Sequence, residues 1–298
     1  MTADSVAAPK AATGIASGGA PARGIGHWLV RVALGALILL WTIPTIGLLI
    51  SSFRPQEAVQ TSGWWTQISS PLEWTFDSYT TVLDGGMGSA FVNSLAVSIP
   101  ATVIPILAAA FAAYAFAWMD FRGREVFFII FVGLLVVPLQ VALTPILRIY
   151  SSLGITGEFL GVWLAHTAFG MPLAVYIFRN YIGSLPREVI ESAKVDGAGH
   201  FQIFWRLVIP LSVPALAAYA IFQFLWVWND LLVAIVFLGG NREVAVVTQA
   251  LQNLLGSQGQ AWHLLTAGAF ITMVVPLIVF FSLQRFFVRG LTAGSVKG

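Results

Sequence analysis

Six long stretches of this 298-residue chain contain no Asp, Glu, Lys or Arg. They cover residues 32–53, 85–119, 126–147, 159–178, 207–229 and 244–284. The hydrocarbon core of a bilayer is about 30 Å thick, and about 20 apolar residues cross it as a helix, so each stretch is long enough for a span. Charged residues make up 9% of the chain, against about 25% in soluble domains. The sequence therefore predicts an integral membrane protein.

The spans are predicted to be helices, because only helices and closed barrels pair every backbone group inside lipid. The apolar runs are continuous, whereas barrel strands alternate. Residues 244–255 have an amphipathic pattern and a polar run follows at 256–260, so only the second part of the last stretch is predicted to span. We expect an all-α protein with six transmembrane helices. They lie at about residues 28–50, 88–118, 126–147, 159–180, 211–237 and 264–284.

The ends of the chain are assigned by composition and charge. Residues 1–26, rich in Ala, Gly and Pro, are predicted to form a disordered tail ahead of one six-span domain, 27–298. Twelve of the 15 Lys and Arg residues fall on one predicted side and three on the other, so both termini are expected in the cytoplasm. The majority side has Lys10, Arg23, Arg31, Arg122, Arg124, Arg179, Arg187, Lys194, Arg206, Arg285, Arg289 and Lys297, and the other side has Arg54, Arg148 and Arg242.

Several classes of chemistry are not expected. The chain has no Cys and its four His residues lie far apart in the sequence, so neither a disulfide framework nor a metal site is predicted. A Gly-x-x-x-x-Gly-Lys-Ser/Thr loop is missing, so ATP would have to be bound by another subunit, and this chain is expected to need no cofactor. A His-Glu-x-x-His motif is also missing, and no catalytic residue is predicted.

Residues 184–210 form the most specific segment between the spans. Pro186 suits a helix start and Gly197 suits its end. Phe201, Phe204 and Trp205, with Val208, then recur at helical spacing and predict a second short helix with one apolar stripe. Two short amphipathic helices on the cytoplasmic side suit helix-in-groove binding to a partner protein. The alternative is a loop that lies in the membrane interface.

The same segment resembles a known family. Glu191-Ser192-Ala193, three further residues, Gly197, nine further residues and then 207–210 (Leu-Val-Ile-Pro) are similar to the EAA loop of permease subunits of ATP-binding-cassette (ABC) importers. Ser192, Leu207 and Ile209 stand where that pattern has Ala, Ile and Leu. The stretch 228–230 (Trp-Asn-Asp) and the ending 283–298 resemble the sugar-importing branch, in particular its smaller, maltose-type permease, and the likeness covers about residues 28–298.

This resemblance implies the fold of a type I ABC importer permease in a bacterial inner membrane. It also implies four kinds of partner: a homologous larger permease, two ATP-binding-cassette ATPase subunits, an extracytoplasmic sugar-binding protein and membrane lipid; nucleic acid is not expected. Coupling to the ATPases would fall to Glu191, Ser192, Ala193, Gly197 and Pro210 in the loop 184–210. A permease for a non-sugar solute is the main alternative. A secondary transporter is less well supported, because the halves show no repeat.

Polar side chains inside spans suggest a translocation path, because a central Asp costs about 2.5 to 3.5 kcal/mol on insertion scales. Asp230 and Asn229, with Trp226 and Trp228 as flat faces for a sugar ring, are the predicted path residues. The alternatives are hydrogen bonds between helices and an interfacial Trp belt. Other span residues are expected to bond between helices, namely Asn93, Gln140, His166 and Gln223.

The polar run at 256–260 is predicted to lie on the extracytoplasmic side. Ser257, Gln258 and Gln260 offer both donors and acceptors, and the two glycines beside them free the backbone. We expect this run to contact the binding protein and to compete for sugar hydroxyls. An ordinary solvated turn is the alternative.

Overall fold

The computed structural model describes residues 25–69, 74–254 and 261–293, and all regular structure in these ranges is helical. The long helices are α1 (Ile25–Ser52), α5 (Gly88–Trp118), α8 (Phe159–Gly183), α11 (Ile209–Trp228) and α14 (Trp262–Ala293). The shorter ones are α2 (Gln56–Thr61), α3 (Thr66–Ser69), α4 (Asp77–Val82), α6 (Arg124–Gly133), α7 (Leu139–Leu153), α9 (Arg187–Val195), α10 (His200–Ile203), α12 (Leu232–Leu238) and α13 (Val247–Leu254). Short turns of other helix types are η1 (Leu83–Met87), η2 (Leu134–Val136) and η3 (Phe204–Val208).

The predicted all-helical membrane fold is confirmed. Within the described ranges, five helical segments are long and apolar enough to cross a bilayer, and the bent pair α6 and α7 makes a sixth if it counts as one span. The five are Trp28–Ser52, Asp77–Trp118, Phe159–Gly183, His200–Trp228 and Trp262–Arg285. Most of the predicted tail, residues 1–24, lies outside the described residues.

The chain divides into two compact units, Met1–Gly47 and Leu48–Gly298, and the described part of the first belongs to α1. This helix is apolar around its whole circumference, as expected of a helix whose solvent is lipid. Its Thr42 hydroxyl donates to the Ile38 carbonyl one turn earlier, at 2.6 Å, so the polar group is paired within the helix.

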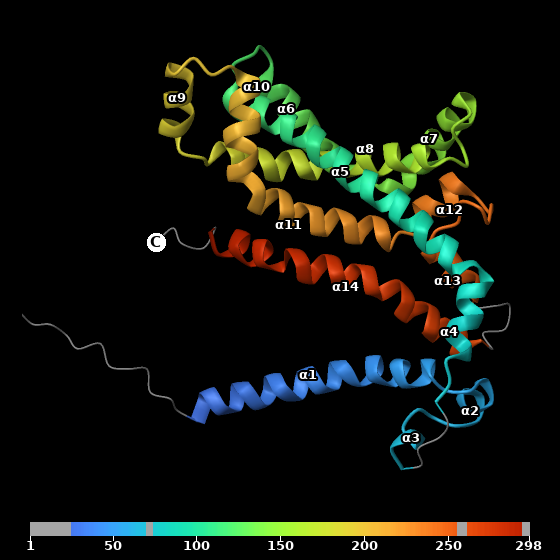
Figure 1. Cartoon of the computed structure of the whole chain (residues 1–298). Helices are drawn as coiled ribbons and strands as arrows, with labels where there is room; N and C mark the ends of the chain where they lie inside the picture. The colour runs from blue at the N-terminus through green and yellow to red at the C-terminus, as the bar shows by residue number, and fades with distance from the viewer. Residues whose placement is uncertain (1–24, 70–73, 255–260, 294–298) are drawn as a thin grey trace, which may run out of the picture. The chain divides into compact units, whose positions relative to one another are not determined.

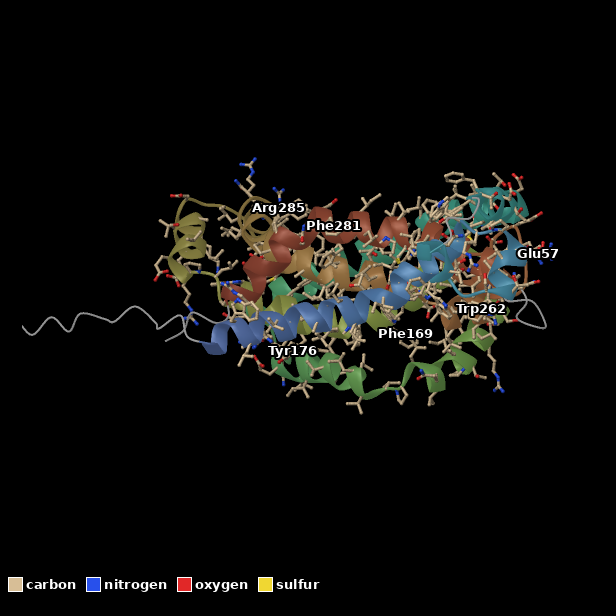
Figure 2. The ribbon with its side chains drawn as sticks, turned by 90° about the horizontal axis from the view of Figure 1, so that it is seen from below. Glu57, Phe169, Tyr176, Trp262, Phe281 and Arg285 are labelled. Carbon is tan, nitrogen blue, oxygen red and sulfur yellow. The ribbon has the colours of Figure 1, made fainter. Side chains whose placement is uncertain are left out.

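The core of the second unit is the packing of α5, α8, α11 and α14 (Figure 1). Ala109, Ala113 and Ala174 are fully buried where α5 meets α8, because small side chains let two helix backbones approach closely in a membrane protein. A methyl group on Gly170 of α8 would lie 2.7 Å from Oε1 of Gln223 in α11. Figure 2 shows α14 running from Trp262 at one end to Phe281 and Arg285 at the other.

The two prolines of α5 each leave a carbonyl without a partner, and donors from neighbouring helices bind both carbonyls. A proline has no N–H for the carbonyl four residues earlier, so Pro100 and Pro105 free two carbonyls of α5. The Trp163 indole of α8 donates to the carbonyl of Ala96 at 3.1 Å. The Gln223 amide of α11 donates to the carbonyl of Ala101, also at 3.1 Å. With both carbonyls paired, α5 continues as one helix through its two prolines.

A carbonyl freed by proline is paired in the same way in α14. Pro276 frees the carbonyl of Thr272, and the indole of Trp228 in α11 donates to it at 3.1 Å. Trp228 is buried between Phe91 and Phe224, so its ring fills the core while its N–H pairs the carbonyl.

Two predicted spans differ from the structure in shape. The stretch predicted as one span at 126–147 falls on two helices, α6 and α7, and the chain bends by 103° between them. Val137 and Pro138 both have an extended backbone and directly precede the second helix, so the chain turns at that point. The stretch predicted as 211–237 is likewise divided, because α11 ends at Trp228 and α12 begins at Leu232.

Candidate functional site

The first arm of the EAA loop (residues 184–210) is α9. Ile190 is its fully buried residue and anchors the helix in the core, while Glu191 and Ser192 are exposed and Ala193 is half-buried. Glu188 in the first turn and Lys194 in the last complement the helix dipole. The arm therefore presents its polar face away from the helical core.

The spacing of Ala193 and Gly197 has a physical basis. The N–H of Ala198 donates to the Ala193 carbonyl at 2.9 Å, and the N–H of Gly197 donates to the Lys194 carbonyl at 3.0 Å. These two bonds define a Schellman motif, which needs a residue with positive φ just past the helix end. Gly197 has φ +82° and nothing within 4 Å of an added Cβ. The glycine is required by its backbone angle, because space around it is ample.

The second arm joins α10, the π-turn η3 and α11. Pro210 has no N–H for the carbonyl of Arg206, and the chain instead forms a wider turn in which the N–H of Ile209 bonds the carbonyl of Phe204. The wider turn changes the register of the side chains. Phe204 is buried against α5, while Phe201 is 71% exposed. The predicted stripe is divided between two environments, because Phe204 and Val208 are buried while Phe201 and Trp205 are exposed.

Contacts with α5 hold the second arm in place. The Phe204 ring stacks on Phe111 with centroids 4.2 Å apart. The Tyr114 hydroxyl and Nδ1 of His200 are 2.9 Å apart and share a hydrogen bond. A cavity of about 260 Å³ lies between the two arms, lined by residues of both that include Ala193 and Arg206.

Asp230 lies at the break between α11 and α12. Its carboxylate accepts hydrogen bonds from the N–H groups of Val233 at 2.9 Å and Ala234 at 3.1 Å, and so caps the first turn of α12. Nε2 of His166 in α8 is 3.8 Å from the same carboxylate oxygen. The Thr248 hydroxyl of α13 donates to the Asp230 carbonyl at 2.8 Å. Asp230 therefore links α8, α12 and α13.

The four predicted path residues separate into two groups. Trp226 lies edge-on to His166, with ring centroids 5.0 Å apart, and so belongs with Asp230. Trp228 faces α14 and is paired with the Thr272 carbonyl. Asn229 is exposed and donates to the Leu225 carbonyl of its own helix at 2.7 Å. His166 and Thr248 join Asp230 and Trp226 in one group. The sequence signal for His166 is a polar side chain within an uncharged span.

A cavity of about 320 Å³ lies beside Trp226 at the bend between α6 and α7. Its lining is apolar, and comes from Leu135, Val137 and Leu139 at the bend and from Phe169 and Pro172 of α8. The bend and the Asp230 group thus share one residue, Trp226.

The segment 239–254 is held by α5 at the opposite end from the EAA loop. The Asn93 amide donates to the carbonyls of Glu243 at 2.8 Å and Ala245 at 3.0 Å, and the Ser94 hydroxyl accepts the N–H of Val247 at 2.8 Å. The predicted contact residues Ser257, Gln258 and Gln260 lie outside the described residues. No three His, Asp or Glu side chains in the described part of the chain are close enough to hold a metal ion.

A multi-span helical protein with a two-helix EAA loop has the architecture of a membrane transport permease. The family of binding-protein-dependent transport system inner membrane components matches residues 101–293, and this chain belongs to that family. The resemblance inferred from residues 191–210 is thereby confirmed. The chain is a multi-pass membrane protein and a transporter component, not an enzyme.

Individual relatives agree with this membership. The chain is 60% identical to the osmoprotective compounds uptake permease protein GgtD of Synechocystis sp., over 90% of this chain and 91% of the relative. It is 44% identical to the alpha-glucoside transport system permease protein AglG of Rhizobium meliloti, over 91% and 97%. A chain of a bacterial ABC transporter that imports alginate has a TM-score of 0.63 at 18% identity, over 88% and 96%, and this likeness concerns the fold.

Proposed function

We propose that this chain forms half of the translocation pathway of an ATP-driven importer for a sugar, in the range of an oligosaccharide, a glycoside or a polyol. The names of the relatives support the substrate class, since AglG is a permease for alpha-glucosides and the AraQ protein of Bacillus subtilis, 33% identical, is one for arabinooligosaccharides. The partners in this proposal are a homologous larger permease, two ATPase subunits that bind the ATP, and an extracytoplasmic binding protein.

The orientation follows from the charge distribution, with the EAA loop and both termini in the cytoplasm. Segment 239–254 then lies on the extracytoplasmic side. Gln252 of α13 and Glu188 of α9 are both exposed, and the native chain has no Cys. An impermeant thiol reagent added to intact cells should therefore label Gln252→Cys and leave Glu188→Cys unlabelled. The reverse labelling would overturn the orientation.

The observation that carries the coupling role is the Schellman motif of the EAA loop. It fixes the end of α9 while Glu191 and Ser192 remain exposed, so the ATPases would meet a rigid projection instead of a flexible loop. Pro210 sets the wide turn that joins this projection to α11. Closure of the ATPase pair would thus move α8 and α11 together.

Two glycine variants test this role as a matched pair. Gly197→Ala forces a side chain into positive φ, at a cost of about 1 to 2 kcal/mol, whereas Gly199 has φ −72° and equal space around it. In a complex reconstituted with its ATPases and binding protein, Gly197→Ala should lower uptake per ATP hydrolysed, and Gly199→Ala should not. Glu191→Lys should abolish uptake while the subunits still copurify. Normal uptake by both Gly197→Ala and Glu191→Lys would refute the coupling role.

The translocation path in this proposal runs along Trp226 and Asp230 beside the bend between α6 and α7. Backbone without helical hydrogen bonds is tolerated at membrane depth only where it is covered by protein or lines a water-filled cavity. Val136 at this bend is 82% exposed in the single chain. The bend would accordingly face the path and the partner permease. Trp228, whose indole pairs the Thr272 carbonyl, is assigned to the support of α14 and not to the path. Asn229 remains a prediction for the path, and Ser257, Gln258 and Gln260 remain predictions for the contact with the binding protein.

A non-sugar solute is the second candidate, and the name of GgtD, which refers to osmoprotective compounds, favours keeping it. Copurification followed by ligand screening separates the two. An ATPase, a second permease and a binding protein should copurify with the chain. Thermal-shift assays of that binding protein with glycosides, oligosaccharides, polyols and charged osmolytes then identify the class. Stabilisation by the charged osmolytes alone would reject the sugar proposal.

A further inference from the structure

Helix α5 contacts both of the segments to which the proposed function gives a partner. Figure 1 shows it running from α13 at one end of the bundle to α10 at the other. Asn93 and Tyr114 mark the two contact points, and the helix between them is about 30 Å long at 1.5 Å per residue. Both residues belong to one uninterrupted α-helix.

At the α13 end, α5 bonds to backbone rather than to side chains. The Asn93 amide donates to two carbonyls, of Glu243 and Ala245, and Ser94 accepts the N–H of Val247. These three bonds fix the start of α13 and the turn before it. The segment 239–254 therefore cannot shift along the membrane normal without breaking them or moving α5.

At the α10 end, α5 holds the second arm of the EAA loop by two different contacts. Tyr114 is 4% exposed, and its hydroxyl bonds His200 at 2.9 Å. This bond tolerates a change in the protonation of His200, because a hydroxyl can both donate and accept. One turn earlier, Phe111 stacks on Phe204. The arm and the end of α5 therefore form one packed body.

Between these contacts, α5 would be a poor mechanical link if its prolines were left unsupported. Two missing backbone bonds in succession are a usual cause of a kink. The donors on Trp163 and Gln223 replace them from α8 and α11. Gln223 is fully buried and its Oε1 also accepts the Tyr219 hydroxyl at 2.9 Å, so its orientation is fixed.

We propose that α5 transmits the state of segment 239–254 to the EAA loop, and that Asn93 and Tyr114 are the positioning residues at its two ends. The inference rests on the proposed function, in which the first segment faces the binding protein and the second faces the ATPases. A displacement imposed at α13 reaches α10 through a single helix. Docking of the sugar-loaded binding protein is thereby transmitted to the ATPases along a route that lies within this one subunit.

The test uses the complete complex in lipid vesicles, with ATP hydrolysis measured in the absence and presence of the loaded binding protein. Asn93→Ala and Tyr114→Phe should each reduce the stimulation of ATP hydrolysis by the loaded binding protein about fivefold. ATP hydrolysis in the absence of the binding protein should be unchanged. The double variant should show no greater loss than the stronger single variant, because both changes interrupt the same route.

Matched controls carry the same chemical changes on exposed residues of α8. These are Asn180→Ala and Tyr176→Phe, and both should retain full stimulation. Stimulation of Asn93→Ala and Tyr114→Phe at the level of these controls would overturn the inference. A double variant whose loss is the product of the two single losses would also overturn it. A wild-type complex that no binding protein stimulates would instead contradict the proposed function.

Discussion

Helix α5 and the pair α6 and α7 both contain proline at membrane depth, yet one continues as a helix and the other bends by 103°. In α5 the carbonyls freed by Pro100 and Pro105 are bound by side chains of other helices. At the bend, the carbonyl of Leu134, four residues before Pro138, is bound by the N–H of Val137 at 3.1 Å. The freed carbonyl is paired in both cases, but at the bend its donor comes from the chain itself.

The difference concerns how the carbonyl freed by each of these three prolines is paired. At Pro100 and Pro105 a donor from a neighbouring helix binds it and the helix continues, whereas at Pro138 the local donor is reached by tightening the chain into a turn. The first solution gives a continuous link between two ends of the molecule. The second gives a bend whose apolar residues line a cavity beside Trp226.

The largest effect on stability should follow from removing the Gln223 amide of α11, which donates to the Ala101 carbonyl at the centre of α5. Gln223→Leu leaves the buried Ala101 carbonyl without its donor, at a cost of about 1 to 3 kcal/mol, whereas the Tyr219 hydroxyl keeps its bond to the Gly170 carbonyl. The purified subunit complex should unfold at a lower temperature, measured by tryptophan fluorescence. Gln140→Leu on α7, where the side chain is exposed, is the matched control. Equal unfolding temperatures for the two variants would contradict this account of α5.

The sequence was sufficient for the helical membrane class, because uncharged stretches of span length are visible in it. It was not sufficient for the bend, since Pro138, Pro100 and Pro105 look alike until the donors around them are known. Those donors come from residues far away in the chain, such as Gln223, which is 122 positions from Ala101. The EAA spacing was readable as a motif, and the structure adds the reason for it in the carbonyl of Ala193.

Asp230 illustrates a signal that was present in the sequence and interpreted differently. An Asp directly before an apolar run is typical of a helix start. The prediction of one span over 211–237 places Asp230 inside the span and does not use this signal. The predicted stripe at 201–208 is divided for a related reason, because its spacing alone does not show that Phe204 stacks on Phe111 of α5 while Phe201 is exposed.

A smaller effect is expected for Trp228→Phe, which removes the donor to the Thr272 carbonyl while the ring still fills the core. The loss should be about 1 kcal/mol, seen as a lower unfolding temperature with uptake per assembled complex unchanged. Trp226→Phe should give the opposite result, with stability retained and uptake reduced, because Trp226 lies beside the bend and His166. If both variants behave alike, the separation of the tryptophans into support and path is wrong.

Changing the bend between α6 and α7 should lower the unfolding temperature less than Gln223→Leu or Trp228→Phe. Pro138→Ala restores an N–H that can bond the Leu134 carbonyl in a regular turn, so α6 and α7 gain a route to a straighter arrangement. Stability should change by less than about 1 kcal/mol, while uptake falls because the cavity beside Trp226 narrows. Cysteine pairs across the bend, cross-linked by a short reagent, measure the change in shape. Unaltered cross-linking together with unaltered uptake would show that Pro138 does not set the bend.

The smallest change in stability is expected for Asp230→Asn, at the other interruption, between α11 and α12. Asp230→Asn keeps a side-chain oxygen that can accept from Val233 and Ala234, so the cap should lose only a few tenths of a kcal/mol, whereas Asp230→Ala should lose about 0.5 to 2 kcal/mol. The charge is removed in both variants. If Asp230 serves only as a cap, Asp230→Asn transports normally and Asp230→Ala loses stability and uptake together. If its charge also acts in the path beside His166, Asp230→Asn loses uptake with its unfolding temperature intact, and we expect this second result because Nε2 of His166 lies 3.8 Å from the carboxylate.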